Sequence, residues 1–192
     1  MLSPDEEAPL LVQCAPHLKP LVITALHTGF RVSELHSLTW GDIDLRRRVI
    51  TVPAAYSKNG KSRSIPMNAV LTTTLKAVKM KAATEGPVFR TPQGEPYRNF
   101  CTAFEHAVQQ AGLEDFTFHD LRYTFASRLV TAGVDLPTVK DLLEHRGIAM
   151  TLRYTHLSTD HKQRAVHALE QFGSKVPAIF TTGRARRTGR LS

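Results

Sequence analysis

His119 and Arg122 carry chemically useful side chains and lie one helical turn apart in the sequence. At about 100° per residue, both fall beside the apolar stripe of the helix that we expect from His119 to Ala132, not at the centre of that stripe. Their imidazole and guanidinium groups can therefore face one ligand together. Alone, the pair is a weak signal, because a His-Arg pair on a helix is more often a solvated surface feature. Its interpretation depends on what accompanies it.

Four other short segments accompany this pair. In chain order the five segments read TGFRVSEL at 28–35, SKNG at 57–60, HDLR at 119–122, LLEH at 142–145 and TLRYTH at 151–156. Their order and spacing resemble those of the tyrosine recombinase (phage integrase) family, from Leu2 to about Phe172. Singly, Arg31 could be a helix-dipole partner, Lys58 a solvated loop charge and Tyr154 a half-buried core aromatic. The combination of types and spacings favours the family instead.

The resemblance implies a catalytic set, carried over position by position. It comprises the first family arginine, the lysine of the hairpin loop, the HxxR pair, the position that holds histidine or tryptophan, and the nucleophile: Arg31, Lys58, His119 with Arg122, His145 and Tyr154. Glu34 matches an acidic position three residues after the first arginine, where we expect it to support the site without transferring a proton. No cofactor-binding or metal-binding residue is implied.

One residue departs from the family pattern. Family members commonly show Leu-Gly-His where this chain has Leu143-Glu144-His145. A carboxylate close to DNA is mildly unfavourable, and it would weaken the site if it pointed inward. The histidine itself stays in place.

The chemistry explains why these residue types are needed. A phosphodiester is anionic and gains charge on its nonbridging oxygens during attack, so the guanidinium groups of Arg31 and Arg122 suit its transition state. His145 would add a hydrogen bond to these oxygens, and His119 could do the same or accept the proton of Tyr154. We expect Lys58 to protonate the leaving deoxyribose oxygen. A phosphotyrosine conserves the bond energy, so rejoining needs no nucleotide cofactor.

The implied protein is a site-specific DNA recombinase or integrase, an enzyme that cleaves and rejoins DNA through a 3′-phosphotyrosyl intermediate. Its expected partners are double-stranded DNA and other recombinase protomers assembled on that DNA. Two alternatives remain open at this point. One is a type IB topoisomerase-like enzyme, which reseals the same strand, and the other is a non-catalytic DNA-binding regulator.

Composition agrees with a DNA-binding protein of the cell interior. Lysine and arginine number 25 against 17 acidic residues, which gives a formal charge of +8 and favours a polyanionic partner. Cys14 and Cys101 lack CxxC spacing, which indicates a reducing, cytoplasmic compartment without disulfides or a cysteine-built zinc site. No apolar run approaches the roughly 18 residues that span a bilayer, so we expect no membrane association. His156 and His161 show no convincing metal-ligand pattern.

The elements that position the catalytic set are mostly helices. Helical periodicity predicts a helix that begins at Pro16 and ends at Gly29, and others over 70–78, 100–111, 119–132, 135–143 and 158–172. Between Trp40 and Met67 the pattern is extended, with a turn signal at Asn59-Gly60, and predicts a small antiparallel sheet. The predicted fold is mainly α with a small antiparallel β-sheet (α+β), of the DNA breaking-rejoining enzyme type.

The resemblance also sets the expected domain organisation. Residues 1–172 would form the catalytic domain, and residues 173–192 a basic C-terminal tail that is either disordered or docked. Relatives usually carry a helical core-binding domain before the catalytic one. Because this chain starts where the catalytic domain starts, we expect that N-terminal domain to be absent from it.

Overall fold

A computed structural model describes the chain except for residues 57–59, 82–84, 98, 155–165, 168 and 170–192. Its contacts divide the chain into two units, Met1–Leu157 and Ser158–Ser192. Of the second unit, only residues 166, 167 and 169 are described, and all three are exposed. The predicted final helix over 158–172 and the basic tail therefore lie almost wholly outside the described residues. The following paragraphs concern the first unit.

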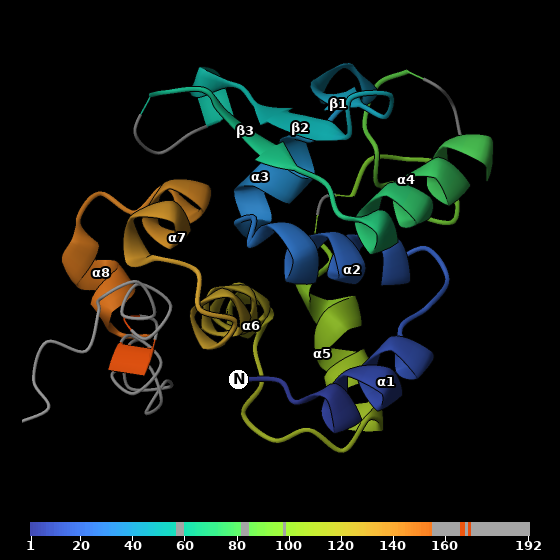
Figure 1. The fold of residues 1–192 in the computed structure, drawn as a ribbon. Helices are drawn as coiled ribbons and strands as arrows, with labels where there is room; N and C mark the ends of the chain where they lie inside the picture. Colours follow the sequence, from blue (N-terminus) through green and yellow to red (C-terminus); the bar gives the residue numbers. More distant parts are fainter. Residues whose placement is uncertain (57–59, 82–84, 98, 155–165, 168, 170–192) are drawn as a thin grey trace, which may run out of the picture. The chain divides into compact units, whose positions relative to one another are not determined.

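The first unit consists of helices and one small sheet (Figure 1). In order, its elements are α1 (Pro4–Gln13), α2 (Lys19–Thr28), α3 (Val32–Ser37), η1 (Trp40–Asp42), β1 (Ile43–Asp44), β2 (Val49–Val52), η2 (Ala54–Tyr56), β3 (Arg63–Pro66), α4 (Ala69–Lys81), α5 (Cys101–Gln110), α6 (Phe118–Thr131), α7 (Leu136–Leu143) and α8 (Ile148–Leu152). The prediction of a mainly helical fold with a small antiparallel sheet is confirmed.

The three strands form an antiparallel sheet in the order β1-β2-β3. Ile50 of β2 lies opposite Ile43 of β1 and Ile65 of β3, and all three side chains are buried on one face. This alternation of buried and exposed positions is what places one face of a strand on a core. Val52 pairs with Arg63 in the same register, so Arg63 shares the inward face of β3 with Ile65.

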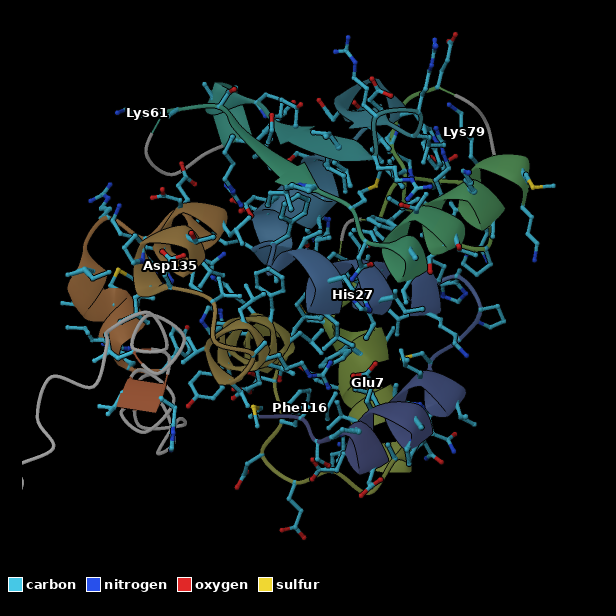
Figure 2. All side chains as sticks on the ribbon, in the orientation of Figure 1. Glu7, His27, Lys61, Lys79, Phe116 and Asp135 are labelled. Atoms are coloured by element: carbon cyan, nitrogen blue, oxygen red, sulfur yellow. The ribbon has the colours of Figure 1, made fainter. Side chains whose placement is uncertain are left out.

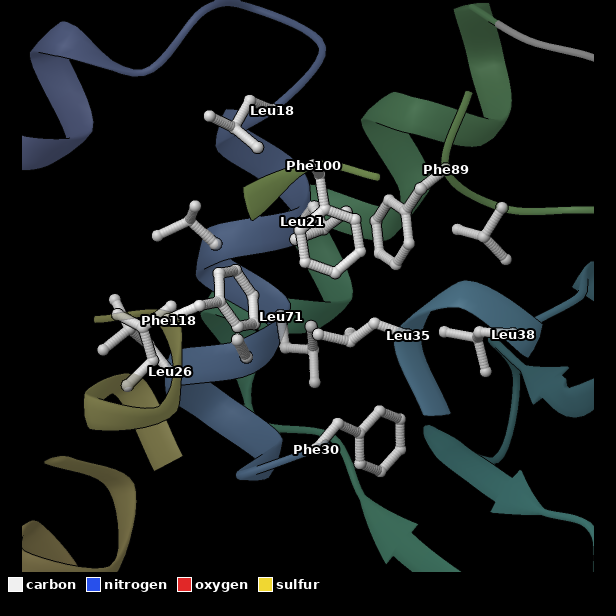
Figure 3. Close-up of a cluster of buried hydrophobic side chains, with 14 of the residues drawn as sticks. Leu18, Leu21, Leu26, Phe30, Leu35, Leu38, Leu71, Phe89, Phe100 and Phe118 are labelled. Atoms are coloured by element: carbon white, nitrogen blue, oxygen red, sulfur yellow. The ribbon is translucent and has the colours of Figure 1, made fainter. Parts of the chain in front are cut away.

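The main core surrounds α2 (Figure 3). Leu18, Leu21 and Leu26 contribute its buried stripe, and they meet aromatic and aliphatic side chains from α3, α4, α5 and α6. Helix α2 packs against both α4 and α6, and α6 packs in turn against α5 and α7. A second, smaller cluster lies between α6 and α7 and contains Tyr154. The helices that carry the catalytic set therefore pack together through α2 and α6.

Local sequence signals set most helix ends. Ser3 caps α1 and exchanges hydrogen bonds with Glu6, and the carboxylate of Asp135 accepts the backbone N–H of Thr138 at the start of α7 (Figure 2). Gly29 ends α2 with a φ of 63°, as the sequence predicted. No described helix is long and apolar enough to cross a membrane.

Candidate active site

Arg31 lies between two helices and is oriented by Glu34. It follows the end of α2 and precedes the first residue of α3, and its backbone N–H donates to Oε2 of Glu34 at 2.8 Å. Its guanidinium Nη1 also donates to Oε1 of Glu34 at 2.9 Å. Glu34 thus stabilises the first turn of α3 and holds the Arg31 side chain with the same carboxylate. The sequence predicted Arg31 just past a helix end but did not predict α3.

Arg122 is anchored to backbone carbonyls from two other elements. Its Nη1 donates to the carbonyl oxygen of Gly29 at 2.6 Å, and its Nη2 donates to the carbonyl oxygen of Leu143. The residue is only 4% exposed. Burial, and then the nearby charge of Arg31, lowers the pKa of Arg122 to about 10, so the guanidinium remains protonated at neutral pH. One arginine on α6 therefore connects the end of α2 to the end of α7.

Gly29 allows this connection because no side chain could fit there. A Cβ atom on Gly29 would lie 2.5 Å from Cδ1 of Phe125 and 2.8 Å from Cδ2 of Leu143. Its positive φ is also one that residues with a side chain rarely adopt. The glycine in the 28–35 segment is thus needed both to end α2 and to let α6 and α7 approach.

His145 precedes α8 in the chain and Tyr154 follows it, and their rings are parallel. The ring centroids are 6.3 Å apart at an interplanar angle of 8°. Nδ1 of His145 is 2.9 Å from Oγ1 of Thr151, which fixes the orientation of the imidazole. Burial, and then the charges of Arg122 and Arg31, lowers the pKa of His145 to about 4, so the ring is neutral at neutral pH.

The phenol of Tyr154 is held in its protonated form. The residue is 8% exposed and packs with Phe125, Val139 and Leu143 in the smaller cluster. Burial raises the pKa of Tyr154 above its usual value, although the neighbouring charge of Arg122 acts in the opposite direction. Formation of a tyrosinate at neutral pH therefore requires a proton acceptor.

A cavity of about 690 Å³ brings the sequence-predicted residues together. Its lining includes five members of the catalytic set: Arg31, His119, Arg122, His145 and Tyr154. His119 is exposed, and in its protonated form it is near enough to lower the pKa of His145. Glu34 lies behind Arg31 and is buried. Lys58 is outside the described residues.

The sequence did not single out Arg63, which the structure joins to this set. Nη1 and Nη2 of Arg63 donate to Oε1 and Oε2 of Glu34 at 3.0 and 2.9 Å, and its guanidinium lies over the ring of Phe30. Burial raises the pKa of Glu34, but hydrogen bonds and charges from Arg63 and Arg31 outweigh it, and the pKa is lowered. The sequence did contain a signal for Arg63: residues two apart in a strand share a face, so an arginine two residues before the buried Ile65 points inward.

Glu144, the residue that departs from the family pattern, also lines the cavity. Its Oε2 accepts hydrogen bonds from Nη1 of Arg31 at 3.1 Å and from Nη1 of Arg63 at 2.9 Å. Glu144 adopts a φ of 54° at the end of α7, a conformation that favours glycine. The carboxylate points inward, toward the first arginine of the set.

The arrangement can bind and polarise an anionic group. Arg31 and Arg122 offer fixed positive charge, His145 offers a neutral imidazole, and Tyr154 offers a hydroxyl beside them. Among the described residues, no group of three or more histidine, cysteine or acidic side chains is arranged to hold a metal ion.

Comparisons with known proteins show the family of the chain. The model of the phage integrase family matches residues 2–161. The integrase of Salmonella phage P22 is 32% identical over 188 residues, covering 92% of this chain and 49% of that protein. The tyrosine recombinase XerD of Vibrio cholerae is 33% identical over 169 residues, covering 82% of this chain and 54% of that protein. The chain thus spans about half the length of these relatives.

Solved structures of integrases share the fold of this chain. The catalytic domain of bacteriophage HP1 integrase superposes with a TM-score of 0.68 at 29% identity, covering 87% of this chain and 93% of that domain. The integrase of transposon Tn1549, solved in complex with transposon right end DNA, superposes with a TM-score of 0.75 at 23% identity, over 88% of this chain and 65% of that one, and shows the shared fold. With its recombinase fold and a family match over most of its length, this chain belongs to the phage integrase family.

Proposed function

We propose that this chain is the catalytic domain of a site-specific tyrosine recombinase, which cleaves and rejoins double-stranded DNA through a covalent bond to Tyr154. The observation that carries the proposal is the convergence of Arg31, Arg122, His145 and Tyr154 on one cavity, from positions up to 123 residues apart in the sequence. Two guanidiniums and a buried tyrosine hydroxyl are what attack on a phosphodiester requires.

The arginines hold the scissile phosphate in this mechanism. A phosphodiester carries one negative charge, and charge builds on its nonbridging oxygens as Tyr154 attacks. Arg122 is fixed by the carbonyls of Gly29 and Leu143, so its charge is oriented before DNA arrives. A preorganised charge of this kind stabilises the transition state without reorganisation during the reaction. His145, neutral at pH 7, donates one further hydrogen bond to the same oxygens.

Proton transfers accompany the exchange of bonds. The Tyr154 oxygen forms a bond to phosphorus while the bond from phosphorus to the 5′ oxygen of the next nucleotide breaks. Because its pKa is raised, Tyr154 must lose its proton during attack, and His119, which lines the same cavity, is the proposed acceptor. Lys58 is the proposed donor of the proton that the departing 5′ oxygen takes up.

Rejoining reverses these steps on a second strand. The 5′ hydroxyl of a partner strand attacks the phosphotyrosine, Tyr154 recovers its proton, and a phosphodiester forms. The phosphotyrosine retains the energy of the original bond, so the proposed reaction uses no nucleotide cofactor. Strand exchange needs more than one active site, and we propose that several protomers assemble on the DNA, in the cytoplasm.

The proposed domain organisation follows the family. Residues 1–172 would form the catalytic domain, and residues 173–192 a basic tail that adds positive charge. The formal charge of +8 supports binding to the DNA backbone, whose affinity depends on phosphate contacts and on counterion release.

Covalent trapping tests the proposal. The chain is incubated with a pool of nicked duplexes of randomised sequence, from which the short strand carrying the freed 5′ hydroxyl diffuses away. A denaturing gel should then show a protein–DNA adduct, and mass spectrometry should place the nucleotide on the peptide that contains Tyr154. Tyr154→Phe, which removes only the hydroxyl, should form no adduct while keeping its DNA affinity within a few-fold. An adduct formed by this variant would place the nucleophile elsewhere.

The reaction products separate the proposal from its alternatives. Transfer of the trapped strand onto a second duplex indicates recombination, whereas relaxation of a supercoiled plasmid without recombinant products indicates a topoisomerase-like activity. Binding without any adduct indicates a non-catalytic DNA-binding protein.

A further inference from the structure

Glu144 forms an ion pair with Arg31, one of the two arginines that bind the scissile phosphate in the proposed mechanism. Its carboxylate lines the same cavity as Arg122 and Tyr154, and its Oε2 accepts from Arg31 at 3.1 Å and from Arg63 at 2.9 Å. The side chain of Glu144 is only 9% exposed, so solvent screens these ion pairs less than pairs on an open surface.

The terminal nitrogens of Arg31 are already directed at acceptors within the protein. Nη1 donates to the carboxylates of Glu34 and Glu144, and Nη2 donates at 3.3 and 3.5 Å to the carbonyl oxygens of Glu144 and Leu143. Each terminal nitrogen carries two hydrogens. A phosphate oxygen that binds to Nη1 must therefore replace one of its two carboxylate partners.

Glu34 and Glu144 are not equally replaceable. Glu34 is 2% exposed and also accepts the backbone N–H of Arg31, so its loss would disturb the first turn of α3. Glu144 makes the longer contact with Arg31, and its ion pair with Arg63 can persist when the contact to Arg31 breaks. Glu144 is thus the partner that an incoming phosphate would replace.

The charge balance points in the same direction. The cluster around Arg31 contains three guanidiniums, of Arg31, Arg63 and Arg122, and two carboxylates, of Glu34 and Glu144, so the cluster itself carries one net positive charge. Arg146 and Arg153 add positive charge elsewhere in the cavity lining. Without the carboxylate at 144, the cluster would carry two positive charges. The transition state of phosphoryl transfer carries more negative charge than the phosphodiester, so each positive charge at this position matters.

We propose that Glu144 is a positioning residue that acts through Arg31: its carboxylate is an internal counter-ion that holds the guanidinium in the DNA-free protein and is replaced by a DNA phosphate. The inference rests on the proposed function, because it takes the ligand of the cavity to be a phosphodiester. Its consequence is a lower intrinsic affinity for DNA phosphates than the same cavity would have with glycine at this position.

DNA binding without cleavage tests this proposal. All variants are made in the Tyr154→Phe background, and their affinity for a fluorescent duplex of random sequence is measured by anisotropy at several salt concentrations. Glu144→Gln keeps the size and backbone of the residue but removes its charge. It should bind about tenfold more tightly at low salt. The slope of log affinity against log salt should steepen by up to about one, because the DNA then meets one more positive charge that no internal carboxylate balances.

Two matched variants show whether the effect is local and due to charge. Glu144→Asp keeps the negative charge and should stay within about threefold of the parent. Glu105→Gln removes the same charge from α5, which contributes none of the described residues that line the cavity, and should change affinity by no more than about twofold. Glu144→Gly, the residue common in relatives, should reproduce the gain and guards against misfolding of the glutamine variant.

The outcomes are distinct. The proposal is overturned if both neutral variants at 144 bind no more tightly than the parent, or if Glu105→Gln gains as much as they do. Because these measurements need no chemistry, they are independent of whether the chain forms a covalent adduct. A chain that binds as described but forms no adduct would retain the counter-ion role and lose the recombinase function.

Discussion

Nη1 of Arg122 donates a 2.6 Å hydrogen bond to the carbonyl oxygen of Gly29, 93 residues earlier in the chain. This bond attaches α6 to the end of α2 at the point where Arg31 enters the cavity. The close approach exists only because Gly29 has no side chain. The position therefore couples stability to the geometry of the active site.

Gly29→Ala should destabilise the protein strongly. Its Cβ would overlap Phe125 and Leu143, and φ is +63°, so we expect a loss of about 2–4 kcal/mol in the free energy of unfolding. Gly112→Ala is the matched control, because Gly112 has a φ of +70° but nothing within 4 Å of its Cβ position. It should lose only about 1 kcal/mol. Urea unfolding measures both, and equal losses would show that steric overlap is unimportant.

Arg63, which the sequence did not single out, should contribute strongly to stability through its buried ion pairs. Arg63→Ala leaves the buried Glu34 with Arg31 as its remaining arginine partner, and we expect a loss of about 2–4 kcal/mol. Arg47→Ala provides the comparison, since Arg47 is 84% exposed and 3.8 Å from Asp44; it should cost less than about 1 kcal/mol. Thermal and urea unfolding would test this, and similar losses in both variants would contradict the buried-pair explanation.

His145 should make stability depend on pH in the acidic range. In the folded protein His145 takes up a proton only near pH 4, whereas in the unfolded chain it does so near its ordinary pKa of 6.5. Unfolding between these values takes up a proton, so this contribution is complete above about pH 6.5 and is lost as pH falls toward 4. It amounts to at most about 3 kcal/mol.

The corresponding variant is His145→Asn, whose side chain can still bond to the hydroxyl of Thr151. The free energy of unfolding, measured by urea titration at several pH values, should fall less steeply below pH 6.5 in this variant than in the parent. Identical slopes in the two proteins would assign the acid dependence to other groups.

Lys58 is the proposed general acid, and its test is chemical. General-acid catalysis typically contributes ~10²–10⁴-fold, so Lys58→Ala should slow cleavage by about that factor while changing DNA binding much less. Replacing the bridging 5′ oxygen with sulfur supplies a leaving group that departs unprotonated. The defect of Lys58→Ala should then largely vanish, whereas Arg122→Ala should stay impaired. An equal, unrescued defect in both would assign Lys58 to phosphate binding.

Local sequence signals determined the helix ends and the family. Ser3, Gly29 and Asp135 act through hydrogen bonds or backbone conformations within a few residues, so their effect can be predicted without the rest of the fold. Residue types and spacing were also enough to predict five cavity residues and the family to which the chain belongs. The helices α3 and α8 were not predicted, because six and five residues are too few to show a periodic pattern.

Only the tertiary structure decided what surrounds Arg31. Glu144, at the end of α7 and 113 positions away in the chain, binds Arg31 directly. Arg63, on β3 and 32 positions away, binds the same two carboxylates as Arg31, and no local pattern records contacts over such separations. Sequence alone left open whether the carboxylate at 144 pointed inward. The packing of α6 and α7 against Gly29 fixes that direction, because it brings the end of α7 over the start of α3 and leaves the Glu144 carboxylate between two guanidiniums.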